Sequence, residues 1–237
     1  MIAKEQYRLD TGAEIEGFEV KGWHFLYRTI ETFAPVIFTA VILLICTPMV
    51  MTPFKKQLNI EKVFPINYLK KVTSRVFSTW ILGTIALFIL YFLCFLVGTI
   101  RNGTGSISYP ILVYSENDYW VEPLWKVLGK STLLFIFIIL AIIVTLQVIS
   151  QITKNNLATL FLAMFFIIGP YVSLLKGAET TFAWLIPTFY LDTLLITEGV
   201  TGALALNPMI NVWTGILINI VYSLVMLGIS WLIEKKD

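Results

Sequence analysis

The sequence predicts an all-α polytopic membrane protein with five to six transmembrane helices and a re-entrant helical pair before the last span. Of its 237 residues, 57% are hydrophobic, and the mean hydropathy of +0.82 exceeds what a soluble core requires. Charged side chains also avoid four stretches of 21 to 25 residues, namely 32–54, 76–100, 131–153 and 155–175. A helix rising about 1.5 Å per residue crosses a hydrocarbon core of roughly 30 Å within such a length.

Residues 1–31 precede the first of these stretches and are predicted to form an N-terminal arm on the membrane interface. They hold six acidic and four basic side chains, followed by an aromatic cluster at 23–27. Aromatic side chains prefer the headgroup level of a bilayer. His24, the only histidine, is expected to be interfacial rather than a metal ligand or catalytic residue. The arm lacks the apolar centre of a signal peptide, so the first span is expected to direct insertion.

The first two spans are predicted at about 32–51 and 76–99, and the loop 55–75 joins them. This loop carries six basic residues and one acid, which favours the cytoplasmic side. The next connection, 100–130, is rich in Tyr and Trp and is expected to rest on the outer face of the bilayer.

The third and fourth spans are predicted at about 131–150 and 156–174. The polar turn between them is so short that only a tight helical hairpin fits. Lys154 favours the cytoplasmic side for this turn.

The segment from about 180 to 210 is apolar but is interrupted by Pro187, Asp192 and Glu198. Each charge at the bilayer centre costs at least about 2.5 kcal/mol, so a simple crossing is disfavoured. We expect short helices that dip into the outer leaflet and return. The last span, at about 212–233, ends in a lysine-containing tail. Five crossings then place the N-terminus outside and the C-terminus inside, whereas a crossing by 180–210 gives six spans and puts both termini on one side.

The loop segment Glu61-Lys-Val-Phe-Pro-Ile-Asn-Tyr-Leu-Lys-Lys-Val-Thr-Ser-Arg75 carries a resemblance to a known family. Together with the broken segment around Pro187 and the final span ending in lysines, it resembles the transmembrane permease subunit of bacterial ABC transporters of the type-2 exporter class. The likeness covers about residues 32–236. The family's first span has no counterpart here, so we expect either an internal start or a five-span variant.

The resemblance implies a permease in the bacterial cell membrane that works with a separate ABC ATPase subunit and a second permease subunit, the same or a sister chain. No Walker-type glycine loop occurs, so this chain binds no cofactor by that motif, and ATP and Mg belong to the partner ATPase. In the coupling loop, Pro65 can begin a helix with an apolar stripe for docking. Alternatively, the lysines only fix topology and bind anionic headgroups. The coupling residues are Glu61, Pro65, Leu69, Lys70, Lys71 and Arg75, and the stripe is Leu69, Val72 and Val76.

A translocation path in such a permease would be lined by polar and aromatic groups of the first and fourth spans: Thr39, Thr47, Tyr171 and Ser173. Alternatively, the small hydroxyl residues simply join helices. By analogy, the cargo is hydrophobic or amphipathic, for example a peptide, an antibiotic or a lipid, and the uncharged spans suit it.

The charged and reactive residues of the chain bear on other function classes. Asp192 and Glu198 support an ion- or proton-coupled secondary transporter as an alternative. An accessory or immunity subunit of another permease is a further alternative. An enzyme is disfavoured because no HExxH, GxSxG or paired intramembrane His/Asp motif is present, and a net charge of +2 without a basic patch argues against nucleic acid. Cys46 and Cys94 fall inside apolar spans, where neither a disulfide nor a metal site is expected.

Overall fold

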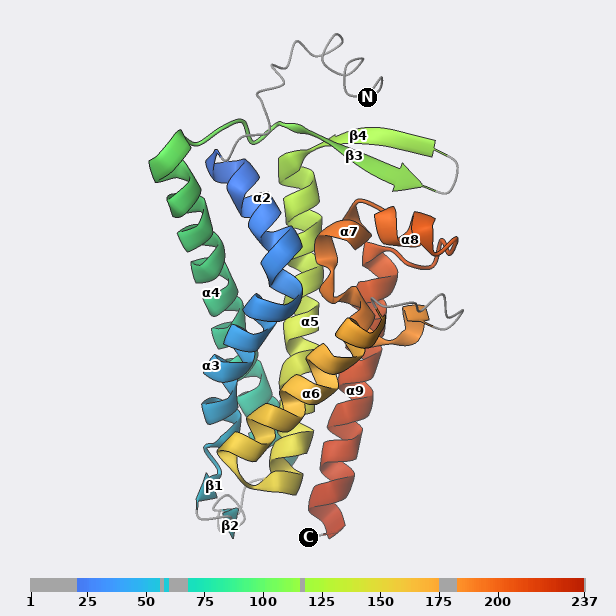
Figure 1. Ribbon diagram of the computed structural model, residues 1–237. Coiled ribbons are helices and arrows are strands. Elements are labelled where there is room, and N and C mark those ends of the chain that lie inside the picture. The colour runs from blue at the N-terminus through green and yellow to red at the C-terminus, as the bar shows by residue number, and fades with distance from the viewer. Residues whose placement is uncertain (1–20, 56–57, 60–67, 116–117, 175–182, 237) are drawn as a thin grey trace.

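The computed structural model describes residues 21–55, 58–59, 68–115, 118–174 and 183–236, which form a helical bundle (Figure 1). Four helical stretches are long and apolar enough to cross a membrane, which indicates an integral membrane protein. They are Gly22–Met51, Lys70–Asn102, Leu124–Thr153 and Val212–Lys235. Helix α6 (Asn156–Leu174) is apolar but shorter, and it runs obliquely across the bundle in Figure 1. A fifth crossing by α6 stays a prediction.

The first long stretch is one continuous helix made of α2 (Gly22–Phe33), the π-helical turn η1 (Ala34–Phe38) and α3 (Thr39–Met51). It begins ten residues before the expected start at 32, within the predicted arm. The early turns are helical and packed, since Leu26 and Ile30 are buried in the core. Pro35 lacks an N–H, and the wider turn that follows lets the Thr39 amide and hydroxyl both reach the Ala34 carbonyl.

Helix α4 (Tyr68–Asn102) follows the small hairpin of β1 (Phe54–Lys55) and β2 (Leu58–Asn59). It packs against α2 where two glycines meet. A Cβ on Gly98 would lie 2.7 Å from the Phe25 Cβ and 3.0 Å from the Gly22 Cα. Small residues therefore let the two backbones approach closely, as is common between membrane helices.

Helix α5 (Leu124–Thr153) is the centre of the bundle and packs against α3, α4, α6 and α9. It is the most buried of the four long stretches. The predicted tight hairpin to α6 is present. Lys154 adopts a left-handed conformation (φ 49°) that ends α5, and the Asn155 Oδ1 accepts the amides of Leu157 and Ala158 at 3.0 and 3.2 Å, which caps α6.

The aromatic connection contains an antiparallel hairpin, β3 (Pro110–Ser115) and β4 (Asp118–Pro123), which the all-α expectation did not include. Along β3, Ile111 and Val113 are buried against the helices, whereas Tyr114 is exposed. This alternation is typical of a strand with one face on a core. The hairpin lies across the end of the bundle where α5 begins (Figure 1).

The segment after α6 breaks into short helices: η3 (Ala183–Leu185), η4 (Pro187–Leu191), α7 (Thr193–Thr197) and α8 (Val200–Leu204). Pro187 begins η4, where its missing N–H leaves no partner unsatisfied. These short helices match the interrupted sequence pattern, while a re-entrant path through a membrane stays a prediction. The last helix, α9 (Val212–Lys236), then runs the length of the bundle beside α5 (Figure 1).

Candidate functional site

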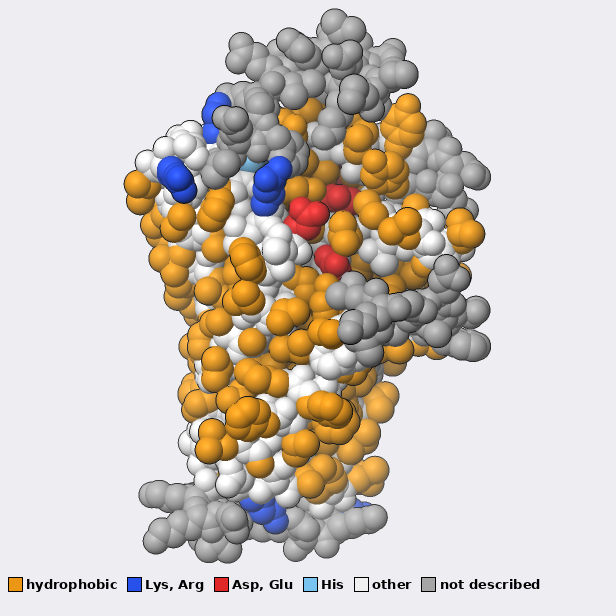
Figure 2. Space-filling model, in the orientation of Figure 1, with side chains coloured by type: hydrophobic (Ala, Val, Ile, Leu, Met, Phe, Trp, Pro, Cys, Tyr) orange, Lys and Arg blue, Asp and Glu red, His pale blue; other side chains and the backbone are white. Residues whose placement is uncertain are grey.

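Four of the six residues predicted to couple to an ATPase, Leu69, Lys70, Lys71 and Arg75, lie at the end of the bundle where α4 begins, which we call the basic end. Glu61 and Pro65 lie outside the described residues, and Leu69 lies in the first turn of α4. Lys70 is exposed there, and Lys71 is partly buried. Figure 2 shows Lys and Arg side chains at this end, below a broad belt of hydrophobic side chains.

Arg75 links α4 to the central helix at the basic end. Its Nη1 donates a hydrogen bond of 3.2 Å to the Gln147 Oε1 on α5. Gln147 itself is buried. The first turns of α4 are therefore joined to α5 by a polar contact as well as by packing.

Two of the three residues of the apolar stripe expected to dock on a partner face the bundle, and the side chain of the third, Leu69, lies outside the described part of the chain. Val72 and Val76 are buried in the protein's own core. Helix α4 is uninterrupted from Tyr68 to Asn102. The side of its first turns that carries Val72 and Val76 therefore continues the side that packs on the bundle further along the helix. Any docking surface on these turns would therefore rest on their exposed polar residues.

The four residues predicted for a translocation path lie on two helices, two on α3 and two on α6. Thr39 and Thr47 are buried, and each hydroxyl donates to a carbonyl of its own helical stretch, at 3.1 Å to Ala34 and 2.6 Å to Leu43. Tyr171 is buried near the C-terminal end of α6, where its hydroxyl contacts Asp192. Ser173 lies in the last turn of α6.

Asp192 and Glu198 belong to a cluster of carboxylates and tyrosines near the end of the bundle that the β3–β4 hairpin covers, which we call the hairpin end. The Tyr27 hydroxyl donates to Glu198, and the Tyr171 hydroxyl donates to the Asp192 Oδ2 at 3.3 Å. Glu31 on α2 adds a third carboxylate close enough to act on the charge of Asp192. Burial raises the pKa of Asp192 to about 6, the hydrogen bond from Tyr171 opposes that shift, and the Glu31 charge adds to it.

These contacts tie the broken segment to α2, which is distant in sequence, and to α6, the helix that precedes it. Tyr27 reaches it from α2, and Tyr171 reaches it from the end of α6. Each acid thus accepts a phenol hydroxyl, while the buried Asp192 Oδ1 has no hydrogen-bond partner among the described residues. Among the residues that the structure describes, no group of three His, Cys, Asp or Glu side chains is placed to hold a metal ion.

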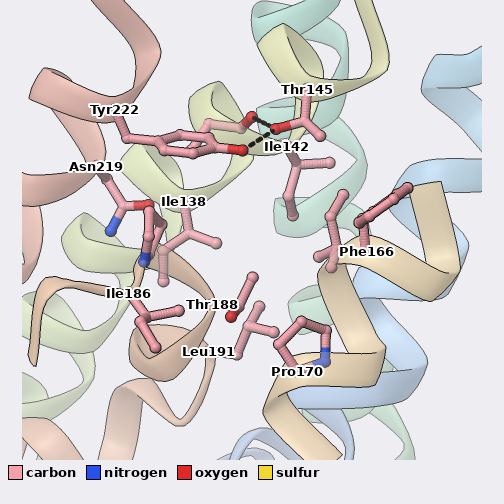
Figure 3. A pocket seen from close by; sticks show the side chains of 13 residues that line it. Ile138, Ile142, Thr145, Phe166, Pro170, Ile186, Thr188, Leu191, Asn219 and Tyr222 are labelled. Carbon is pink, nitrogen blue, oxygen red and sulfur yellow. Dashed lines mark hydrogen bonds between the residues drawn. The ribbon is translucent and has the colours of Figure 1, made fainter. Parts of the chain in front are cut away.

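A cavity of about 150 Å³ lies halfway along the bundle, between α5, α6, α9 and η4 (Figure 3). Its walls are mostly apolar, with Ile138 and Ile142 on one side and Leu191 on the other. Phe166 and Ile186 also line it and are 56% and 37% exposed, so the cavity opens sideways onto the apolar surface of the bundle. Pro187 is the one residue of the predicted set in the lining.

Four polar side chains interrupt the apolar lining: Thr145, Thr188, Asn219 and Tyr222. The hydroxyls of Thr145 and Tyr222 lie 3.0 Å apart and join α5 to α9 (Figure 3). These four residues carry no formal charge, so the charge pattern of the sequence does not single them out. Uncharged polar residues inside otherwise apolar helices, such as Asn219 in α9, were the signal that could have found them.

The arrangement suits binding of a small, mainly apolar molecule at mid-height in the bundle, since pockets of this kind combine apolar walls with few polar groups. Comparison of the chain with protein-family models, with characterised proteins and with solved structures found no match.

Proposed function

We propose that the chain is the membrane-spanning permease subunit of an ATP-driven ABC exporter, which moves a hydrophobic or amphipathic cargo with energy from a separate ATPase subunit. The observation that carries this proposal is the cavity between α5, α6, α9 and η4. It lies at mid-height, has mostly apolar walls and opens sideways, so a membrane-dissolved molecule can enter it without crossing a polar surface.

The basic end supplies a route from an ATPase to this cavity. Lys70 is exposed for contact with a partner, and Arg75 on the same helix binds Gln147 of α5. Thr145, one half-turn before Gln147, lines the cavity. In this mechanism, a push on the first turns of α4 shifts the α5 wall of the cavity.

The exposed apolar faces of α4 and α9 fit contact with the lipid bilayer and with a second permease subunit. Phe92 and Val97 on α4, and Leu217 and Leu224 on α9, are all more than half exposed. Such surfaces are stable only against lipid or another apolar surface. The proposed topology has five crossings, with the segment from about 180 to 210 re-entering from outside and the basic end in the cytoplasm of a bacterial cell.

Copurification tests the proposal. The chain is purified in mild detergent from its host, and mass spectrometry identifies the proteins that accompany it. An ABC ATPase in a fixed ratio is the expected result. A chain that purifies alone contradicts the proposal, and one that purifies with a larger permease favours the accessory-subunit alternative.

Reversing the charges of Lys70 and Lys71 tests whether the ATPase subunit binds at the basic end. In the double variant Lys70→Glu and Lys71→Glu, association with the ATPase should weaken about tenfold or more, because like charges then face an interface built for basic residues. The matched control is Lys126→Glu, an exposed lysine at the hairpin end. Equal ATPase binding by both variants would show that the lysines only set topology.

A second candidate function is proton-coupled transport, which the Asp192–Tyr171 pair favours. The pKa of Asp192 is raised to about 6, close to the range in which a carboxyl exchanges protons under cellular conditions. Asp192→Asn combined with Glu198→Gln should abolish proton-driven uptake into vesicles that lack ATP. Retained uptake would end this candidate.

A further inference from the structure

The cavity contains a buried acceptor that the described residues leave without a partner. Asn219 is fully buried, and its Nδ2 donates a 2.8 Å hydrogen bond to the Gly215 carbonyl. That bond fixes the orientation of the amide, because only the nitrogen can donate to a carbonyl. The Asn219 Oδ1 therefore turns toward the cavity, and no described residue donates to it (Figure 3).

The neighbouring hydroxyls add further acceptor capacity. The Thr145 hydroxyl donates its one hydrogen to the Ala141 carbonyl at 2.8 Å, so Tyr222 must be the donor in the 3.0 Å pair between them. The Tyr222 oxygen keeps its lone pairs. Thr188, across the cavity on η4, has a buried hydroxyl without a partner among the described residues. The Thr188 hydroxyl can donate as well as accept, so the polar groups of the cavity together offer more acceptors than donors.

An unsatisfied acceptor in an apolar site costs about 1–3 kcal/mol, so a molecule that donates to it gains affinity. The volume of about 150 Å³ sets the size of that molecule. An apolar cavity of roughly this volume holds one benzene ring. It is much larger than a single water, which occupies about 30 Å³ in the liquid, and its apolar walls give further waters few partners.

We propose that this cavity binds a ring-sized apolar group that carries one hydrogen-bond donor, such as a phenol or an indole, with the donor directed at the Asn219 Oδ1. The molecule enters sideways from the bilayer, past Phe166 and Ile186. That this group is part of the transported cargo rests on the proposed function, whereas its binding to the cavity does not.

Fluorine NMR of the purified chain in detergent tests the binding. The probes are 4-fluorophenol, 4-fluoroanisole, which is the same ring without the donor, and fluorobenzene. Protein-free micelles measure partition into the detergent. The phenol should bind about five- to tenfold more tightly than the anisole, which corresponds to one net hydrogen bond. Equal binding of these two probes by the native chain overturns the proposal without any variant.

Two variants locate the site. In Asn219→Leu the preference for the phenol should vanish while fluorobenzene still binds, which also shows that the cavity is intact. Ala141→Leu places a larger side chain in the α5 wall and should abolish binding of all three probes. A preference that survives Asn219→Leu, binding that survives Ala141→Leu, or no binding to the native chain, as for a cavity that holds only water, would each refute the assignment.

The assay needs no ATPase. If no ATPase partner is found, the exporter proposal fails, but a positive ring-binding result remains valid. Conversely, failure to bind the rings leaves the copurification result unchanged.

Discussion

Replacing Gly199 by alanine tests how the β3–β4 hairpin is fastened to the helical bundle. Gly199 has a φ of +73°, and a Cβ at this position would lie 1.9 Å from the Tyr114 carbonyl oxygen. The hairpin must therefore move away. The adjoining hydrogen bond from the Tyr114 amide to the Glu198 carbonyl, 2.6 Å long, would then be lost.

The expected loss of stability has two parts. The left-handed conformation costs a residue with a Cβ about 1–2 kcal/mol. Losing the hydrogen bond and part of the hairpin packing adds about 1–2 kcal/mol. The free energy of unfolding should thus fall by about 2–4 kcal/mol, which corresponds to about 4–16 °C in Tm for a chain of this size.

The matched control is Gly103→Ala. Gly103 also has a positive φ, +81°, but apart from its chain neighbours no atom of the described residues lies within 4 Å of its Cβ position. Only the conformational cost of about 1–2 kcal/mol then applies, or about 2–8 °C. Thermal unfolding is followed in detergent with a thiol-reactive dye, since Cys46 is fully buried in the folded chain. Equal losses in the two variants would refute the argument that the hairpin is locked at Gly199.

Two further predictions concern charge and helix packing. The pKa of Asp192, about 6 against an ordinary 3.8, lies above its unfolded value, so its contribution to stability is present below about pH 4 and is lost as the pH rises through 6. Asp192→Asn should raise the free energy of unfolding at pH 7.5 by about 1–3 kcal/mol and much less at pH 4.5; an equal effect at both pH values would contradict this assignment. Gly98→Ala should cost about 1–3 kcal/mol by forcing α2 from α4, whereas Gly228→Ala, with open space at its Cβ, should gain up to about 1 kcal/mol; Tm values in detergent check the difference, and equal shifts would show that the helices do not depend on the close contact.

The sequence alone predicted the long helices. Charge-free runs of membrane-spanning length are a local property, because each residue's transfer to an apolar environment is favourable regardless of its neighbours in space. The tight α5–α6 hairpin was also predictable from a local property, because its short polar turn permits few other connections. The interruption at Pro187 was also visible, because proline acts on its own backbone.

Pairing and burial required the tertiary structure. The β3–β4 hairpin could not be predicted from the sequence, because its aromatic residues are common both in β-strands and at membrane interfaces. The sequence also could not show that Val72 and Val76 face the bundle rather than a partner. Polar residues surround Val72 and Val76 in the first turns of α4, so the apolar stripe fits either the protein's own core or a partner, and only the neighbouring helices decide which.

The cavity depended most on tertiary structure. Its walls come from α5, α6, α9 and η4, and its acceptor, the Asn219 Oδ1, is meaningful only because no donor from these elements reaches it. Hydrogen-bond satisfaction is a relation between groups distant in sequence, and so it follows from packing rather than from local pattern. The sequence thus determined that the chain is built of membrane-length helices, and the packing of those helices decided where it can hold a ligand.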